Sequence, residues 1–162
     1  MTDKAYIMNS PVDLNKKVPD LPKDTTHDPV AAAEKALEDL DQDFGMWMAE
    51  EANRLARAWQ AIAKGGMTPE SREELYGPSH DIKGEAATFG YPLAGDIADS
   101  LCRLLDVNTD AAKLPLDVIE NHVLAIQAVV KEDAKDAEHR IGRELVAELR
   151  GLVDDFAAAL HK

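Results

Sequence analysis

The stretch LDVIENHVLAIQAVV, residues 116–130, decides the fold class of this chain. A heptad-like stripe of apolar side chains runs through it: Leu116, Ile119, Val123, Ile126 and Val130. Spacings of three and four residues return to one face of an α-helix, whereas a half-buried β-strand requires strict alternation. The stretch therefore predicts an amphipathic helix that buries one face against other helices.

The same period continues on both sides of this stretch. Before it, we expect a helix over residues 30–64, a second from Thr68 to Gly90, and a third over residues 93–106. After it, a charge-rich helical stretch at 131–140 leads into a fifth helix that ends near residue 160. The first helix should bury Leu37, Leu40, Phe44, Met48, Leu55, Trp59 and Ile62, with a bend at Gly45. The fifth should bury Ile141, Leu145, Leu149, Leu152, Phe156 and Leu160.

Local signals mark where these helices begin and end. Asp28 followed by Pro29 combines a side-chain acceptor with a preset φ, as expected at a helix N-terminus. Gly65-Gly66 should end the first helix, and Gly90 should be the C-cap glycine of the second. Pro78 lacks an amide hydrogen and lies inside the second helix, so we expect a kink or a fresh helix start at Gly77-Pro78.

Helices of these lengths joined by short links pack best as an antiparallel bundle. We therefore predict an all-α, up-and-down helical bundle over residues 29–162, with a four-helix core and an additional helix or helical extension. Four of the eight prolines lie within the first 29 residues, which show no sustained apolar period. Residues 1–28 are therefore expected to form a flexible arm.

Composition excludes several classes of function. Hydrophobic residues make up 45% of the chain, but the sequence contains no run of about 18 apolar residues that could cross a membrane. Its first residues also lack the uninterrupted apolar segment of a signal peptide. The formal net charge of -13 would repel a nucleic-acid backbone. The single cysteine, Cys102, cannot form an internal disulfide and should be a buried thiol in a reducing compartment. We expect a cytoplasmic protein.

The stretch SHDIKGEAATFG, residues 79–90, carries the candidate chemistry. With Ile82 at the centre of the buried face of a helix, His80 points toward solvent. The positions that share the buried face are Leu75, Ser79, Ala86 and Phe89. An exposed imidazole is largely unprotonated at neutral pH, so its nitrogen lone pair is free to attack phosphorus.

The residues around His80 suit a partner that delivers a phosphoryl group. Gly84, one turn later, would let another protein approach without a side chain in its path. Lys83 can bring an ammonium group near the phosphoryl oxygens. Nothing nearby in the sequence supplies a general base or a nucleotide cradle, so His80 is predicted to be a carrier. A partner would cover an exposed ring formed by Tyr76, Lys83, Ala87 and Thr88.

The pattern His80-x-x-Lys83-Gly84, followed by Ala86, Phe89, Gly90 and Leu93, resembles the HxxKGxxxxxG signature of histidine-containing phosphotransfer (HPt) domains. The signature covers residues 80–90, and the compatible helical pattern covers nearly all of the chain after Pro29. The resemblance implies that His80 is the phosphoacceptor, that Lys83 stabilises the phosphoryl group and that Gly84 gives access. It also implies that a receiver domain supplies the aspartate and the magnesium ion. The chain would then be a phosphocarrier that needs no cofactor, and not an enzyme.

We therefore expect a monomeric phosphorelay intermediate that takes a phosphoryl group from one response-regulator receiver domain and passes it to another. A hybrid histidine kinase is a further candidate partner. The alternative is a helical interaction module that binds and regulates a receiver or a histidine kinase without being phosphorylated. A third reading is the dimerisation and phosphoacceptor part of a histidine kinase, although no ATP-binding domain is expected within these 162 residues.

The other histidines carry no comparable signal. His27, His122, His139 and His161 show no i, i+4 pairing with one another or with Cys102, so no metal site is expected. His122 lies at the edge of the apolar stripe of residues 116–130. A packed, hydrogen-bonded structural role is predicted for it.

Overall fold

The computed structural model describes residues 28–108 and 110–161, and every regular element among them is helical. The all-α prediction is therefore confirmed. The chain divides into two units, residues 1–35 and 36–162, of which the first is described only from residue 28 onward. The predicted arm, apart from Asp28, lies outside the described residues.

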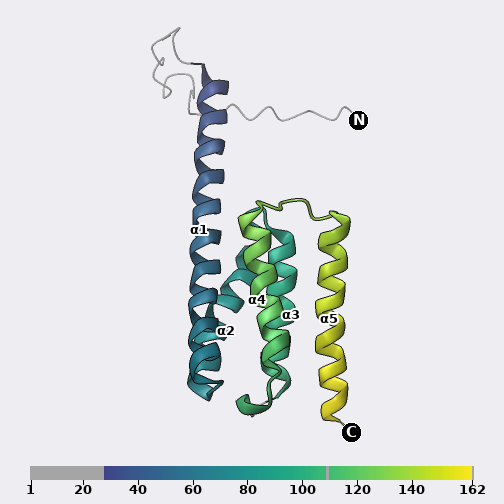
Figure 1. Ribbon diagram of the computed structural model, residues 1–162. Coiled ribbons are helices and arrows are strands. Elements are labelled where there is room, and N and C mark those ends of the chain that lie inside the picture. The colour runs from purple at the N-terminus through teal and green to yellow at the C-terminus, as the bar shows by residue number, and fades with distance from the viewer. Residues whose placement is uncertain (1–27, 109, 162) are drawn as a thin grey trace, which may run out of the picture. The chain divides into compact units, whose positions relative to one another are not determined.

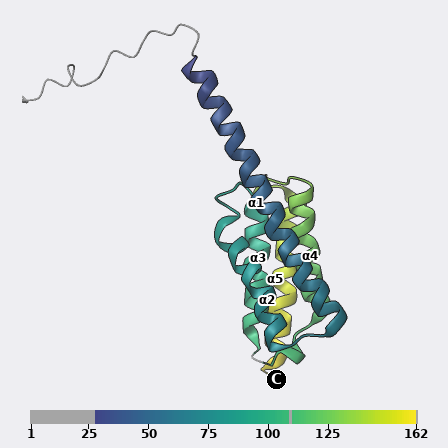
Figure 2. The ribbon, with the colours of Figure 1, turned by 90° about the vertical axis from the view of Figure 1, so that its left-hand side faces the viewer.

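Five α-helices and one short 3-10 helix follow one another along the chain. They are α1 (Pro29–Gly65), α2 (Pro69–Glu85), α3 (Pro92–Val107), η2 (Ala111–Lys113), α4 (Leu116–Lys131) and α5 (Arg140–Leu160). Figures 1 and 2 show α2, α3, α4 and α5 side by side, with the chain reversing direction between one helix and the next. This is the predicted up-and-down arrangement.

The predicted start signals act through hydrogen bonds at the first turns. Asp28 Oδ1 accepts from the Val30 amide at 2.9 Å, as expected of an N-cap. At α2, Thr68 Oγ1 accepts from the Ser71 amide at 3.1 Å, and Ser71 Oγ accepts from the Thr68 amide at 2.9 Å. This reciprocal capping box satisfies two amide groups that the helix itself leaves without acceptors.

The end of α2 differs from the prediction. The α-helix stops at Glu85, and residues 86–90 form a turn that Gly90 closes with a φ of +88°. The Tyr91 amide donates to the Ala86 carbonyl at 2.7 Å, and the Gly90 amide donates to the Ala87 carbonyl at 3.2 Å. These two bonds form a Schellman motif, which needs a residue in the left-handed region at the position of Gly90. The predicted cap glycine is confirmed, but it ends a turn and not the α-helix.

The predicted fresh helix start at Gly77-Pro78 is wrong, because α2 runs continuously through Pro78. Two features make the proline tolerable. Gly77 has no Cβ, which removes part of the clash that a proline imposes on the preceding residue. Pro78 is also buried against the bundle, so packing opposes a break in the helix.

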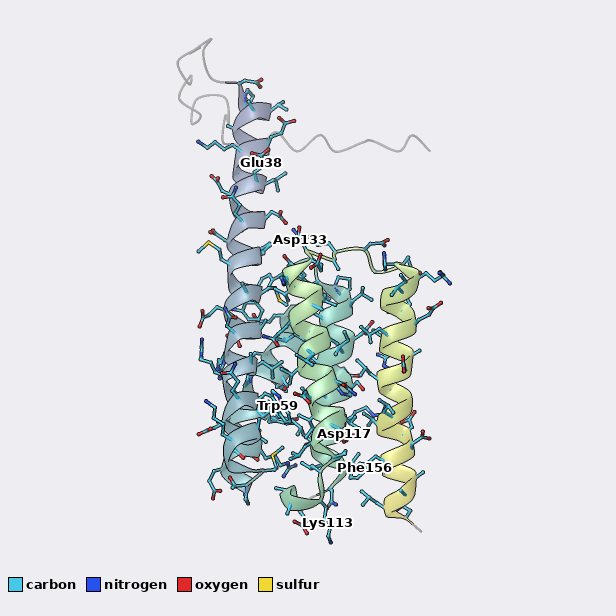
Figure 3. The ribbon with its side chains drawn as sticks, viewed as in Figure 1. Glu38, Trp59, Lys113, Asp117, Asp133 and Phe156 are labelled. Atoms are coloured by element: carbon cyan, nitrogen blue, oxygen red, sulfur yellow. The ribbon has the colours of Figure 1, made fainter. Side chains whose placement is uncertain are left out.

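The core lies between the helices and draws on all five. Trp59 on α1, labelled in Figure 3, is 9% exposed and contributes to it. The largest side chains that are fully buried are Met48, Leu55, Ile62, Leu75, Ile82, Leu93, Ile97, Leu101, Leu104, Leu105, Ile119 and Ile126. Cys102 is also buried, as predicted.

Two predicted apolar faces need correction. On α1, Leu37 and Leu40 are exposed, and the predicted face is buried only farther along the helix. On α5, Ile141 and Leu160 are exposed, whereas the other predicted positions, Leu145, Leu149, Leu152 and Phe156, are buried or half-buried against the core. The buried residues of α5 are Val146, Leu149 and Val153, so its buried face also includes two valines outside the predicted stripe.

The charge-rich segment between α4 and α5 is also not a helix. Residues 132–139 form turns and irregular structure, and Asp133 has a φ of +50°. Tyr91 donates a hydrogen bond to Asp133, and the Lys135 ammonium lies 5.4 Å from the centre of the Tyr91 ring. Contacts with the rest of the bundle therefore determine the conformation of this link.

Candidate functional site

His80 lies on the outer face of α2, with 63% of its side chain exposed. Leu75, Ser79 and Ile82 on the same helix are completely buried. The Ser79 hydroxyl donates to the Leu75 carbonyl at 2.7 Å, so this polar side chain is satisfied inside the core. The predicted outward orientation of His80 is therefore confirmed.

Tyr76 lies one turn before His80 and packs along its ring. The two ring centres are 6.0 Å apart, and the ring planes meet at 25°. Tyr76 is half-buried, and its hydroxyl donates to Asp106 Oδ2 on α3 at 3.3 Å. Burial, followed by the charge of Asp106, raises the pKa of Tyr76. Tyr76 thus links the imidazole to α3 and is less accessible than the sequence suggested.

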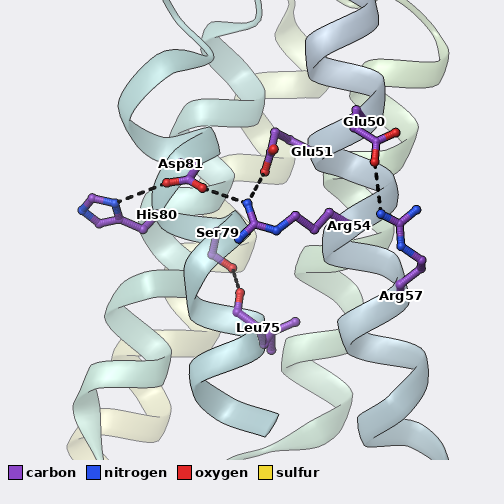
Figure 4. Close-up of polar contacts among 8 residues, drawn as sticks. All are labelled: Glu50, Glu51, Arg54, Arg57, Leu75, Ser79, His80 and Asp81. Carbon is purple, nitrogen blue, oxygen red and sulfur yellow. Dashed lines mark hydrogen bonds and ion pairs between the residues drawn. The ribbon is translucent and has the colours of Figure 1, made fainter. Parts of the chain in front are cut away.

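On the other side of His80, Asp81 links the site to α1 (Figure 4). Asp81 Oδ1 lies 4.0 Å from His80 Nδ1, and Asp81 Oδ2 accepts from Arg54 Nη1 at 3.0 Å. The same Arg54 nitrogen donates to Glu51 Oε2 at 3.1 Å. The hydrogen bond to Asp81 is the main cause of a raised pKa of Arg54. Sequence reasoning missed both Arg54 and Asp81.

Lys83 is already paired across the helix interface. Its ammonium lies 2.9 Å from Asp99 Oδ1 on α3, and the hydrogen bond between them raises the pKa of Lys83. The Lys83 side chain remains 44% exposed, so the pair lies at the surface. A phosphoryl group on His80 would have to share this ammonium with Asp99. The stabilising role of Lys83 stays a prediction.

The two glycines that flank His80 differ in their surroundings. A Cβ on Gly84 would meet nothing within 4 Å, whereas a Cβ on Gly77 would lie 3.3 Å from Arg54 Nη2. Gly77 therefore makes room for the guanidinium that holds Asp81. Internal packing gives no reason for a glycine at position 84, and its role in access stays a prediction.

The remaining predicted contact residues lie just beyond the end of α2. Ala87 and Thr88 are exposed within the turn of residues 86–90. Beside them a shallow groove runs between this turn and α3, lined by Lys83, Ala87, Pro92, Gly95, Asp96 and Asp99. Sequence reasoning did not include the α3 residues, because no spacing rule relates a residue of one helix to those of the next.

Within the ranges that the structure describes, no group of three or more His, Cys, Asp or Glu side chains is placed to hold a metal ion. No described helix is long and apolar enough to span a bilayer.

Comparison of the chain with protein-family models, curated proteins and solved structures gives no match.

Proposed function

We propose that this chain is a phosphorelay intermediate. His80 would accept a phosphoryl group from the phosphoaspartate of one receiver domain and pass it to another. The observation that carries the proposal is the exposed imidazole of His80 on the outer face of a helical bundle, one turn before the open surface at Gly84. The resemblance of residues 80–90 to the HPt signature supports the same role.

The chemistry available to the chain is that of a nucleophile and carrier. A neutral imidazole can attack the phosphorus of an acyl phosphate without another group of the chain taking a proton. The receiver would supply the aspartate and the magnesium ion, so the chain needs no cofactor and no autonomous catalytic site. Lys83 would offset the charge of the phosphoryl oxygens once its ammonium is shared between them and Asp99.

The receiver would dock over the half-buried Tyr76 and the exposed positions Lys83, Ala87 and Thr88. The groove beside Ala87 extends this surface onto α3, where Asp99 is paired with Lys83, and Asp96 with Arg143 and Arg150. The proposal includes a monomeric chain in the cytoplasm, with a hybrid histidine kinase as a further partner.

The test is phosphoryl transfer from a panel of phosphorylated receiver domains. We expect at least one receiver to label the chain, and the label to be acid-labile and alkali-stable, as a phosphoramidate is. His80→Gln should abolish the label, whereas His161→Gln, which changes another exposed histidine, should retain it. An acid-stable label, or an undiminished label on the His80 variant, contradicts the proposal. Receiver binding without any transfer would instead support the regulatory interaction module.

A further inference from the structure

We infer that Asp81, held in place by Arg54, is a positioning residue that orients the His80 ring and keeps the ring proton on Nδ1. Only the effect on phosphoryl transfer rests on the proposed function, because the orientation of the ring can be measured without phosphate. The inference assigns a role to an ion-pair network that joins α1 to the outer face of α2 (Figure 4).

The geometry distinguishes the two nitrogens of the ring. Nδ1 lies 4.0 Å from Asp81 Oδ1, which is too long for a hydrogen bond but short enough for a modest side-chain rotation to form one. A carboxylate beside Nδ1 favours a proton on that nitrogen, since an ionised carboxylate can only accept. Nε2 then carries the lone pair. The Tyr76 ring packs along the imidazole, with 6.0 Å between the two ring centres.

Arg54 is what keeps Asp81 in this position. Adjacent residues on a helix do not ordinarily face each other, so the Asp81 side chain needs an external partner to stay beside His80. Arg54 Nη1 donates to one carboxylate oxygen of Asp81, Oδ2, at 3.0 Å, and the other oxygen, Oδ1, lies 4.0 Å from the imidazole. Glu51 holds the guanidinium in turn at 3.1 Å, and Gly77 leaves space for it.

The transfer step shows why this orientation matters. The Nε2 lone pair forms the nitrogen–phosphorus bond while the acyl phosphorus–oxygen bond breaks, and that electron pair stays on the carboxylate of the receiver. Nδ1 keeps its proton, so the phosphorylated ring carries a positive charge. Asp81 offsets this charge from the side of the ring away from Nε2, and Arg54 limits the repulsion between Asp81 and the phosphoryl oxygens.

The first experiment measures the tautomer of His80 by ¹⁵N NMR on the unphosphorylated chain. The parent should hold the proton mainly on Nδ1, and Asp81→Ala and Arg54→Gln should increase the share that carries it on Nε2. Asp81→Glu should restore the parental tautomer. Arg57→Gln is the matched control, because Arg57 pairs with Glu50 at 3.1 Å on the same helix. These side chains are substantially exposed, so the variants should fold.

The second experiment uses a receiver that phosphorylates the parent. Asp81→Ala should slow transfer about fivefold, the equivalent of the roughly 1 kcal/mol between unit charges 4 Å apart in water. The loss should shrink as salt is added, because screening weakens the same interaction in the parent. Two-dimensional NMR that couples ³¹P to the ring should show phosphate on Nε2 in the parent and a fraction on Nδ1 in the variant. Arg57→Gln should match the parent.

The outcomes separate the two proposals. A parental tautomer in both Asp81→Ala and Arg54→Gln overturns the inference, whatever happens to phosphate. A changed tautomer with an unchanged transfer rate and an unchanged site of phosphorylation also overturns the inference, because the orientation set by Asp81 would then have no effect on transfer. A parent that accepts no phosphate from any receiver contradicts the proposed function, and the tautomer measurement then still decides whether Asp81 orients the ring.

Discussion

The outer face of α2 and the contact between α3 and α4 each contain a histidine, and the two are in opposite environments. His80 is 63% exposed, and its nearest charged oxygen lies 4.0 Å away. His122 is completely buried, with Nδ1 2.7 Å from the Val118 carbonyl and Nε2 2.9 Å from the Ser100 hydroxyl. One side chain has a nitrogen available for chemistry, and the other uses both nitrogens to satisfy the core.

The hydrogen bonds of His122 also assign the tautomer of its neutral ring. The Val118 carbonyl can only accept, so Nδ1 donates to it and Nε2 accepts from the Ser100 hydroxyl. Burial lowers the pKa of His122, and the bond to Val118 opposes that shift in part. The neutral ring is thus a structural link between α3 and α4, as the sequence predicted. Exposure, and not residue type, separates a candidate nucleophile from a core residue.

Replacing each histidine with alanine should give the largest difference between the two regions, measured as a loss in the free energy of unfolding. His122→Ala should lower the free energy of unfolding by about 2–4 kcal/mol, because it leaves a cavity and removes the side-chain bonds to the Ser100 hydroxyl and the Val118 carbonyl. His80→Ala should change it by less than about 0.5 kcal/mol, as for most surface substitutions. Urea denaturation measures both. Equal losses would show that His80 contributes to packing and is not a free surface group.

A side chain at Gly84 should alter function without harming the fold. Gly84→Leu should slow phosphoryl transfer at least about tenfold by blocking the partner, while stability holds or rises by up to about 1 kcal/mol. Gly151→Leu on α5 is the matched control, because a Cβ there also meets nothing within 4 Å. Both variants should gain similar stability, and only the first should lose transfer. Parental transfer by Gly84→Leu would show that the partner approaches elsewhere.

Acid should destabilise the chain through His122. Because the pKa of His122 is lowered in the folded chain, its contribution is complete above the ordinary value near 6.5 and is lost as pH falls through the folded value. One such group changes the free energy of unfolding by at most about 1.4 kcal/mol per pH unit. Between about pH 7 and 5, the parent should therefore lose more stability than His122→Ala. Parallel curves for the two proteins would contradict this assignment.

Most of the helical pattern could be predicted, because it depends on neighbours in the chain. The caps at Asp28 and Thr68 and the left-handed glycine at Gly90 follow from local backbone chemistry. The outward position of His80 follows from helix periodicity alone. These features require no knowledge of which helices come together.

The errors arose where contacts between helices override local preference. A kink or a fresh helix start was expected at Gly77-Pro78, but the burial of Pro78 and the absence of a Cβ on Gly77 permit a continuous helix. The buried face of α5 includes Val146 and Val153, which lie outside the predicted stripe, and leaves Ile141 exposed. Arg54 reaches the site from a position 27 residues before Asp81, and no sequence spacing predicts that contact.

The smallest expected effect is on receiver binding, and it tests whether the surface that a receiver covers around His80 extends to Ala87. Ala87→Glu places a carboxylate on the exposed turn beside the groove that contains Asp96 and Asp99. If a receiver covers this turn, the added bulk and charge should weaken its binding by about 1 kcal/mol or less, about fivefold at most, with or without phosphate on the receiver.

The matched control for this change is Ala147→Glu, at an exposed position of α5. It alters net charge by the same amount, so a general repulsion between acidic proteins would weaken receiver binding equally in both variants. Titration of a labelled receiver measures the two affinities. A selective loss in Ala87→Glu would place the partner over the end of α2, next to the exposed histidine. Parental affinity in both variants would move the docking surface away from Ala87, and the accessible region would then be confined to the immediate surroundings of His80 and Gly84.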